Sequence, residues 1–307
     1  MKNAKTTYPL WQRLCDDLHF ASKNYRRRLA LTDREEAVSL HYRHICKRPL
    51  PLDNPTTLTE WIQWLKLYGD TTAWTTLSDK YAVRDYVAQC GLADHLNKLY
   101  AVYEDPADIQ WDALPDSFIL KPNNGCHSNI VIHDKQKANR QEVTQALRQA
   151  FDEPFGLTTA EFHYLGIKPK VTAEQLLQQP ENPHGLIDYK LYCIGGQVRA
   201  ILTCEPTQGP KPVKTLLDPD WQVRADYNPR PVRAEEVLPR PAILPELLNA
   251  AQTLAKPFPL VRIDYYILHN QPIFGEMTFT PAGGYKPYGT DLFKQEMGQL
   301  LTQTILS

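Results

Sequence analysis

The 307-residue sequence lacks several features that would assign it to a common class of protein. It has no apolar run approaching about 18 residues, so no membrane-spanning helix is predicted. Its N-terminal stretch lacks the apolar segment of a secretory signal. The 34 Lys and Arg residues nearly balance the 35 Asp and Glu residues, so no basic surface for nucleic acid is indicated. We therefore expect a cytoplasmic globular protein with no nucleic-acid partner.

Motifs that identify disulfide, zinc or P-loop sites are also missing. The six cysteines are scattered without a C-x-x-C pair, which favours reduced thiols over a disulfide framework. The nine histidines lack the spacing of a zinc site, and no G-x-x-x-x-G-K-[ST] loop is present. Cys126 and His127 are adjacent, but neighbouring residues on an extended segment point apart, which argues against a nucleophilic pair.

Periodic patterns predict a helical N-terminal part, followed by strands and helices. Residues 1–75 show no strand–helix–strand unit, and a helix over 10–31 precedes one that begins at a capping box from Thr32 to Glu35. Further helices are predicted over 58–68, 78–90, 141–151, 244–255 and 292–301. Strands are predicted over 118–120, 130–132, 170–173, 189–194, 198–204, 261–268 and 273–278. The proline-rich, weakly patterned stretch 206–241 is expected to run over the surface.

The most informative part of the sequence is the pair of strands near its C-terminal end. Alternating residues over 261–268, a turn at 269–272 and a second strand predict a hairpin. Asp264 lies on the first strand, and Glu276 and Thr278 share one face of the second because a strand has a period of two. Two carboxylates and a hydroxyl make an oxygen-rich site suited to Mg²⁺. The alternative is a hairpin whose acids are solvated.

A second candidate site is the loop that follows Lys121, between the strands at 118–120 and 130–132. The loop contains Asn124, Gly125 and Ser128. Such a loop can present backbone N–H groups to phosphate oxygens, and the lysine at its root adds a positive charge. An ordinary hairpin fits the same residues. Lys190 offers a similar choice, because it could reach a phosphate or pair with Asp188 on the same strand face.

In their order along the chain, these residues resemble the ATP-grasp ligases, which include D-alanine–D-alanine ligase. The series is Lys80 on a predicted helix, Lys121, Glu174 with Leu177, Asp188, Arg262 with Asp264, and Glu276 with Thr278. Several stretches look more closely like the teichuronopeptide-biosynthesis (TupA-like) amidoligases: LTEWIQWLKLY at 58–68, SDKYAVRDY at 78–86, DYKLYC at 188–193, FPLVRID at 258–264 and GEMTFTP at 275–281. The resemblance covers nearly the whole chain after residue 46.

The resemblance implies a fold and a role for each residue of the series. The fold is α+β, an ATP-grasp fold with a helical N-terminal segment (1–77), a subdomain with a lid (78–177) and a C-terminal subdomain (178–307). For ATP, the resemblance implies that Lys80 and Lys121 hold the phosphates and that Asn124, Gly125 and Ser128 lie in the loop that closes over the γ-phosphate. It further implies that Glu174 and Leu177 contact the adenine and Asp188 the ribose, with Lys190 as an additional contact. The implied Mg²⁺ ligands are Asp264, Glu276 and Thr278. Arg262 and Lys121 are the implied catalytic residues, with Arg262 stabilising an acyl-phosphate and a tetrahedral intermediate.

The resemblance further implies an ATP- and Mg²⁺-dependent ligase that joins an amino acid to a carboxylate, such as a uronic acid of a surface polysaccharide or its precursor. Two alternatives remain: a kinase of a small molecule or glycan, and a non-catalytic nucleotide-binding module. Two positions depart from the pattern, because Thr278 stands where many grasp ligases have Asn and Ala282 where they have Gly. The number of metal ions, the two substrates, the pathway and the oligomeric state stay open. The loop residues Tyr285, Lys286 and Tyr288 could dock an acceptor or be plainly exposed.

Overall fold

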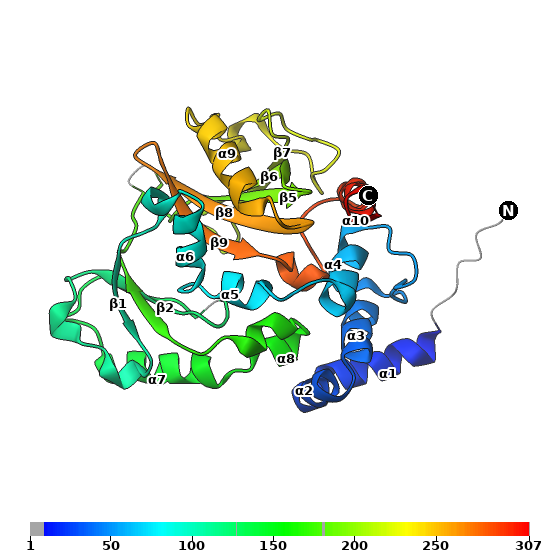
Figure 1. The fold of residues 1–307 in the computed structure, drawn as a ribbon, viewed down its shortest axis with the longest axis horizontal. Coiled ribbons are helices and arrows are strands. Elements are labelled where there is room, and N and C mark those ends of the chain that lie inside the picture. Colours follow the sequence, from blue (N-terminus) through cyan, green and yellow to red (C-terminus); the bar gives the residue numbers. More distant parts are fainter. Residues whose placement is uncertain (1–8, 127, 180–181, 307) are drawn as a thin grey trace.

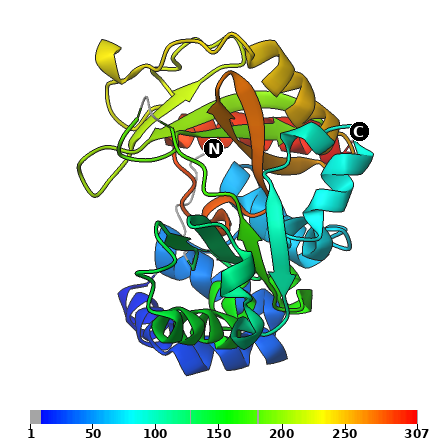
Figure 2. The same cartoon turned by 90° about the vertical axis from the view of Figure 1, so that its left-hand side faces the viewer.

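The computed structural model describes residues 9–126, 128–179 and 182–306. Figures 1 and 2 show two antiparallel sheets in separate parts of the molecule, and the N-terminal helices lie next to the helices at Leu58–Tyr68 and Phe155–Thr159. The helices are α1 (Leu10–Ala21), α2 (Lys23–Thr32), α3 (Arg34–Cys46), α4 (Leu58–Tyr68), α5 (Trp74–Ser78), α6 (Val83–Gln89), α7 (Arg140–Asp152), α8 (Phe155–Thr159), α9 (Leu244–Ala255) and α10 (Asp291–Leu306). The α+β class expected from the sequence is confirmed.

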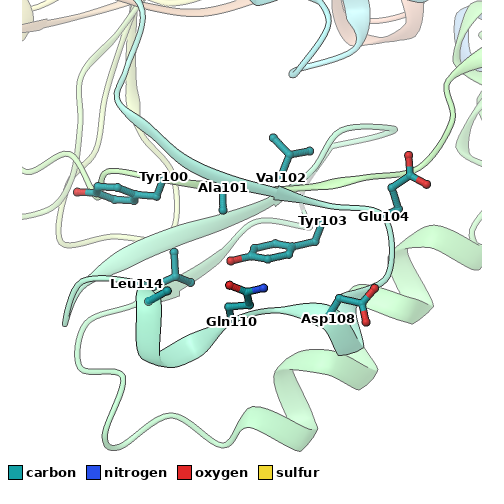
Figure 3. Close-up of a pocket in the computed structure, with 9 residues that line it drawn as sticks. Tyr100, Ala101, Val102, Tyr103, Glu104, Asp108, Gln110 and Leu114 are labelled. Atoms are coloured by element: carbon teal, nitrogen blue, oxygen red, sulfur yellow. The ribbon is translucent and has the colours of Figure 1, made fainter.

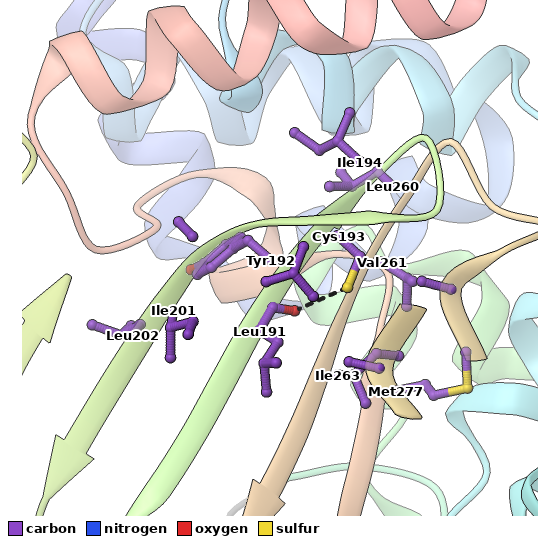
Figure 4. Packing of buried hydrophobic residues seen from close by; sticks show 14 of the residues in the cluster. Leu191, Tyr192, Cys193, Ile194, Ile201, Leu202, Leu260, Val261, Ile263 and Met277 are labelled. Carbon is purple, nitrogen blue, oxygen red and sulfur yellow. Dashed lines mark hydrogen bonds between the residues drawn. The ribbon is translucent and has the colours of Figure 1, made fainter. Parts of the chain in front are cut away.

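The larger sheet has the strand order β7-β6-β5-β8-β9. Its strands are β5 (Asp188–Ile194), β6 (Gln197–Glu205), β7 (Val213–Leu217), β8 (Leu260–Leu268) and β9 (Gln271–Thr278). Helices α9 and α10 pack against it, and Leu191, Ile201 and Ile263 are completely buried in the core that results (Figure 4). The predicted hairpin of β8 and β9 is present, so the alternating pattern was read correctly.

The smaller sheet has the order β1-β4-β2-β3. Its strands are β1 (Leu99–Tyr103), β2 (Phe118–Pro122), β3 (Ile130–Ile132) and β4 (Val171–Glu174). It has a core of its own, built with α7 around side chains such as Phe118 and Leu147. The edge strand β1 was not predicted from the sequence. Four of its five residues are half-buried, so they give no alternation between an apolar and a polar face.

The N-terminal helices differ from the prediction at their ends. The single helix expected over 10–31 is broken at Ser22, whose side chain accepts a hydrogen bond from the N–H of Tyr25 and so begins α2. The capping residue of α3 is Asp33 rather than Thr32. The Thr32 hydroxyl bonds back to the carbonyl of Arg28 within α2 and is not available to α3.

The predicted helix over 78–90 is also wrong at its start, and this changes the setting of Lys80. The Asp79 carboxylate accepts hydrogen bonds from the N–H groups of Tyr81 and Ala82, which holds 79–82 as a turn. Helix α6 begins only at Val83. Lys80 therefore lies in a turn between α5 and α6, not on a helix.

The stretch 206–241 is more ordered than expected, because it contains β7 at one edge of the larger sheet. Strand β7 pairs with β6, and Leu216 and Leu217 are buried. The flanking prolines hid this short strand in the sequence, since proline is typical of loops and sheet edges. Across the described ranges, no helix is both long and apolar enough to cross a membrane.

Candidate functional site

An ion-pair network lies in the larger sheet where β5 and β8 are neighbours. Arg262 on β8 donates from Nε to Asp264 Oδ1 at 2.6 Å and from Nη2 to Asp264 Oδ2 at 2.7 Å. Lys190 on β5 lies opposite Asp264 in the register, and its Nζ donates to Oδ2 at 2.7 Å. Burial alone would raise the pKa of Asp264, but Arg262 and Lys190 hold that pKa below its usual value. Asp264 is therefore an ionised carboxylate with a cationic partner on each oxygen.

Glu276 and Thr278 extend this network from β9. The register places Glu276 opposite Asp264 and Thr278 opposite Arg262. Arg262 Nη2 donates to Glu276 Oε1 at 3.0 Å and to Thr278 Oγ1 at 3.1 Å, and the Thr278 hydroxyl donates to Glu276 Oε1 at 2.8 Å. The Glu276 side chain is 42% exposed, against 4% for Asp264. Glu276 is thus the carboxylate through which this network reaches solvent.

The network supplies the oxygen donors that Mg²⁺ prefers, namely two carboxylates and a hydroxyl on adjacent strands. Within the described part of the chain, no group of three or more His, Cys, Asp or Glu side chains is arranged to hold a metal ion. Mg²⁺ is commonly held by one or two carboxylates together with substrate phosphates, so the residues present fit it in kind. An ion at Asp264 would compete with Arg262 and Lys190 for the carboxylate.

Lys190 has two acidic partners, and the sequence indicated only the weaker one. Its Nζ is 3.5 Å from Asp188 Oδ1 and 2.7 Å from Asp264 Oδ2. Burial raises the pKa of Asp188 in spite of Lys190, and the neighbouring Asp264 carboxylate adds to this rise. The closer ion pair of Lys190 is therefore with Asp264 on β8. The spacing of residues along β5 alone does not reveal this pair.

A second ion pair lies in the smaller sheet, where β2 and β4 are neighbours. Lys121 Nζ donates to Glu174 Oε2 at 2.7 Å, and Thr172 Oγ1 donates to Glu174 Oε1 at 2.9 Å. Glu174 is buried, which would raise its pKa, but Lys121 lowers that pKa below its usual value. The Asn97 amide donates to the same carboxylate at 3.3 Å. Glu174 is thus a paired carboxylate rather than a free acceptor.

One pocket joins the two sheets. It is lined by Lys80, Arg84, Asn97, Lys121 and Glu174 from the side of the smaller sheet, and by Phe274 and Gly275 from β9. Burial lowers the pKa of Lys80, while the nearby Glu276 opposes this shift, so the charges of the two sheets interact across the pocket. Lys80 and Lys121 therefore converge on the strand that carries Glu276.

The loop after β2 is held against this pocket at two points. Lys80 Nζ donates to the carbonyl of Gly125. Asn123 is completely buried, and its amide donates to Asp79 Oδ2 at 2.8 Å. Asn124 is buried and Ser128 is half-buried, while His127 lies outside the described residues, so the pairing of Cys126 with His127 cannot be judged. Leu177 lies in an irregular, half-buried segment beyond β4, away from the residues that line the pocket.

Several residues of the site were missed from the sequence. Asn97 and Arg84 line the pocket. Glu161 is buried and accepts a hydrogen bond from Thr280 Oγ1. Tyr164 lies in η4 (Phe162–Gly166), and burial raises its pKa well above the usual value, with contributions from the charges of Glu161 and Glu276. No motif marks these positions, because their contacts join residues that are far apart in the sequence.

The segment after β9 has an uncommon backbone conformation. It forms η6 (Pro281–Gly284), in which Ala282 has a φ of 54° and Gly283 a φ of 65°. A left-handed conformation favours glycine, so Ala282 carries the strain of a side chain there. The buried Tyr285 follows, and the exposed-loop alternative is wrong for that residue.

A wider groove on the smaller sheet is unrelated to this network. It lies along β1 and is lined by Tyr100, Tyr103, Glu104, Asp108 and Leu114, among others (Figure 3). None of the charged residues of the network lines it. The candidate site is therefore the smaller pocket between the sheets, where the charges converge.

Comparisons with solved structures find similar proteins at low sequence identity. D-alanine–D-alanine ligase from Bacillus anthracis complexed with ATP is 14% identical, with a TM-score of 0.43, 75% of this chain covered and 64% of that chain. L-amino acid ligase from Bacillus licheniformis is 15% identical, with a TM-score of 0.43, 86% of this chain covered and 56% of that chain. The ATP-grasp ligase PsnB complexed with a phosphomimetic variant of its minimal precursor, Mg and ADP is 14% identical, with a TM-score of 0.44 and coverages of 94% and 74%.

The chain thus spans less than two thirds of the two amino acid ligases named first. No curated protein matches it significantly in sequence. The model of the TupA-like ATP-grasp family matches residues 60–305, which is most of the chain and includes each charged residue of the network. The chain belongs to the TupA-like ATP-grasp family.

Proposed function

We propose that the protein is an ATP- and Mg²⁺-dependent ligase that joins a carboxylate to an amine through an acyl-phosphate. The single observation that carries the proposal is the pocket in which Lys80 and Lys121 face β9 beside Glu276. Phosphoryl transfer is catalysed mainly by positioning and by neutralising phosphate charge. Membership of the ATP-grasp family supports ATP as the ligand of this pocket.

The proposed reaction has two steps. A carboxylate oxygen of the acid substrate attacks the γ-phosphorus of ATP, and ADP leaves. The amine then attacks the acyl carbon and forms a C–N bond, the bond from that carbon to the phosphate oxygen breaks, phosphate leaves, and the amine nitrogen loses a proton. Arg262 would neutralise negative charge on the acyl oxygens, and its contacts to Glu276 and Thr278, which extend towards the exposed side of the network, support this role.

The proposed nucleotide contacts follow the pocket. Lys80 and Lys121 would bind the phosphates, with Asn124, Gly125 and Ser128 in the loop above them. Lys121 already neutralises Glu174, so a bound nucleotide would share this cation with the carboxylate. Glu174 and Leu177 at the adenine, and Asp188 and Lys190 at the ribose and phosphates, are part of the same proposal.

Mg²⁺, when bound, would supply positive charge that neutralises the phosphates and polarises the γ-phosphoryl group. Asp264, Glu276 and Thr278 are the residues proposed to hold it. The proposed division of labour along the chain is a helical segment at 1–77, a lid-bearing subdomain at 78–177 and a metal- and acceptor-binding subdomain at 178–307. The proposed substrates are an amino acid and a carboxylate such as a uronic acid of a surface polysaccharide or its precursor.

The test is a substrate screen with ATP, Mg²⁺, amino acids and carboxylic acids that include uronic acids, read by ADP release and by the mass of the product. We expect ADP release coupled to an amide product, and a loss of at least about 100-fold in Glu276→Gln and Asp264→Asn, because charge stabilisation is removed. The matched control is Glu235→Gln, which changes an exposed acid outside the network. A stable phosphorylated product without an amide would identify a kinase instead. Binding of ATP without any turnover would identify a non-catalytic module.

A further inference from the structure

A second polar crevice lies on the other side of η6 from the sheet network, between the N-terminal helices and η4. Its walls are Arg34 at the start of α3, Lys66 on α4, Thr75 on α5, and Phe162 and His163 in η4. It holds about 640 Å³ of space, including space open to solvent. Of the residues proposed to bind ATP or Mg²⁺, none lines this crevice in the described structure.

The crevice concentrates positive charge at a largely buried position. Lys66 is 8% exposed, and its Nζ donates to the carbonyl of Gly283 at 2.6 Å and lies 4.4 Å from the centre of the Tyr285 ring. Arg34 lies at the rim with its guanidinium carbon 4.7 Å from the centre of the Phe162 ring. Among the described residues, no ion pair includes Arg34, so its guanidinium is a cation at the rim without an acidic partner.

His163 gives independent evidence for a missing ligand. The residue is 7% exposed, and its Nε2 is a buried polar atom without a hydrogen-bond partner among the described residues. Leaving such an atom unpaired costs about 1–3 kcal/mol, so native proteins seldom do so without a reason. The ring is fixed by edge contact with Trp74, and the backbone carbonyl of His163 accepts from Thr75 Oγ1 at 2.9 Å.

The acids near the crevice do not line it. Glu161 acts on Lys66 through its charge, but it does not line the crevice, and its carboxyl bonds Thr280. Asp70 accepts from the N–H of Thr72 and also does not line it. Among the described wall residues there is no Asp or Glu, so every charged side chain of the crevice is a hydrogen-bond donor.

We propose that this crevice is a binding site for an anionic oxygen group, a carboxylate or a phosphate, carried by a small ligand. Arg34 and Lys66 would neutralise the group, next to the His163 ring that lines the same crevice. The site goes beyond the proposed ligase chemistry, because none of its walls belongs to the proposed ATP or Mg²⁺ site. The crevice is linked to the proposed ligase site by Lys66, which also donates to the Gly283 carbonyl just beyond β9.

The test follows the histidine ring resonances by NMR while sodium phosphate or sodium succinate is added at constant ionic strength, with chloride as the reference anion. His163→Gln identifies the resonance of His163. We expect a saturable shift of this resonance with at least one of the two anions, and the anion that saturates first identifies the group. Arg34→Gln should weaken the saturation at least about tenfold, because a charge-assisted contact is lost.

Two matched variants separate this site from others. Arg199→Gln removes the same charge from an exposed position on β6 and should leave the titration unchanged. Lys121→Met disables the proposed phosphate site between the sheets and should also leave the His163 titration unchanged. No saturable shift with either anion, or equal titrations for the wild type and Arg34→Gln, would overturn the proposal. A loss of the titration in Lys121→Met would assign the anion to the nucleotide pocket instead. The proposed ligase activity is measured separately, so either proposal can fail alone.

Discussion

Asp264 shows how far a single residue can be interpreted from sequence. Its place on a two-faced strand opposite a second acid follows from the alternation over 261–268 and from the turn that reverses the chain. The pairing of Asp264 with Lys190 on β5 does not follow from the sequence, because the two residues are 74 positions apart and become neighbours only when their strands pair. The sequence therefore predicts that the two acids lie opposite one another, while their cationic partners depend on long-range register.

Lys121 gives the same result in the smaller sheet. The apolar strand before it and the polar loop after it were visible in the sequence. Its pairing with Glu174 required β4 to lie beside β2, with Lys121 opposite Thr172. No local pattern specifies such a register over so long a separation. The same limit explains why Glu161 and Tyr164 were missed.

His163 predicts a pH dependence of stability at the scale of one residue. Burial, with a contribution from Lys66, lowers the pKa of His163 to about 3, against 6.5 for an ordinary histidine. Below pH 6.5 the unfolded chain binds a proton that the folded chain refuses, so stability falls as the pH falls from 6.5 towards 3. At pH 5 this residue should account for a loss of about 2 kcal/mol.

The measurement is chemical denaturation at pH 7 and pH 5 in a buffer without phosphate. In His163→Gln the difference between the two pH values should be smaller by about 2 kcal/mol than in the wild type. His184→Gln, at an exposed histidine, is the matched control. Equal pH dependence in the wild type and His163→Gln would show that His163 is protonated as readily in the folded protein as in the unfolded chain.

At the scale of elements, helices and strands were predicted correctly where the hydrophobic periodicity was strong. Helix α9 and strand β3 match the predicted ranges, and the capping box of α4 between Thr57 and Glu60 fixes its start. The errors lie at element ends, where the start of a helix depends on which nearby backbone N–H group donates to a side-chain hydroxyl or carboxylate. Asp79 is the error with the largest consequence, since its turn removes Lys80 from a helix and aims it at the loop after β2.

The bulge between β8 and β9 predicts a requirement for glycine. The register shifts after Asp264, and Gly275 lies in the shifted segment. A Cβ at this position would lie 3.0 Å from the carbonyl oxygen of Asp264. Gly275→Ala should therefore destabilise the protein by roughly 1–3 kcal/mol and weaken nucleotide binding, because Gly275 also lines the pocket.

Denaturation and nucleotide titration of the same sample check both effects. Gly209→Ala is the matched control, since an added Cβ there meets nothing closer than Thr207 Oγ1 at 3.6 Å. Wild-type stability together with wild-type affinity in Gly275→Ala would contradict the requirement for glycine at the bulge.

At the scale of the whole molecule, the function depends on how two sheets with separate cores face each other. Lys80 and Lys121 lie on the side of the smaller sheet, and Arg262, Asp264 and Glu276 lie in the larger one. The arrangement of one sheet relative to the other cannot be derived from strand patterns, because each pattern describes only its own sheet. The expectation that charges from both parts of the chain converge comes from the resemblance to the ATP-grasp family, whose model matches residues 60–305.

The central claim is that cations of the smaller sheet and acids of the larger sheet bind one triphosphate. The most direct measurement is calorimetric titration with a non-hydrolysable ATP analogue, with and without Mg²⁺, of the wild type, Lys121→Met and Glu276→Gln. We expect one nucleotide per chain, an affinity about 10- to 100-fold weaker in Lys121→Met, and a Mg²⁺ dependence that disappears in Glu276→Gln. Nucleotide binding that both variants leave unchanged would contradict the claim.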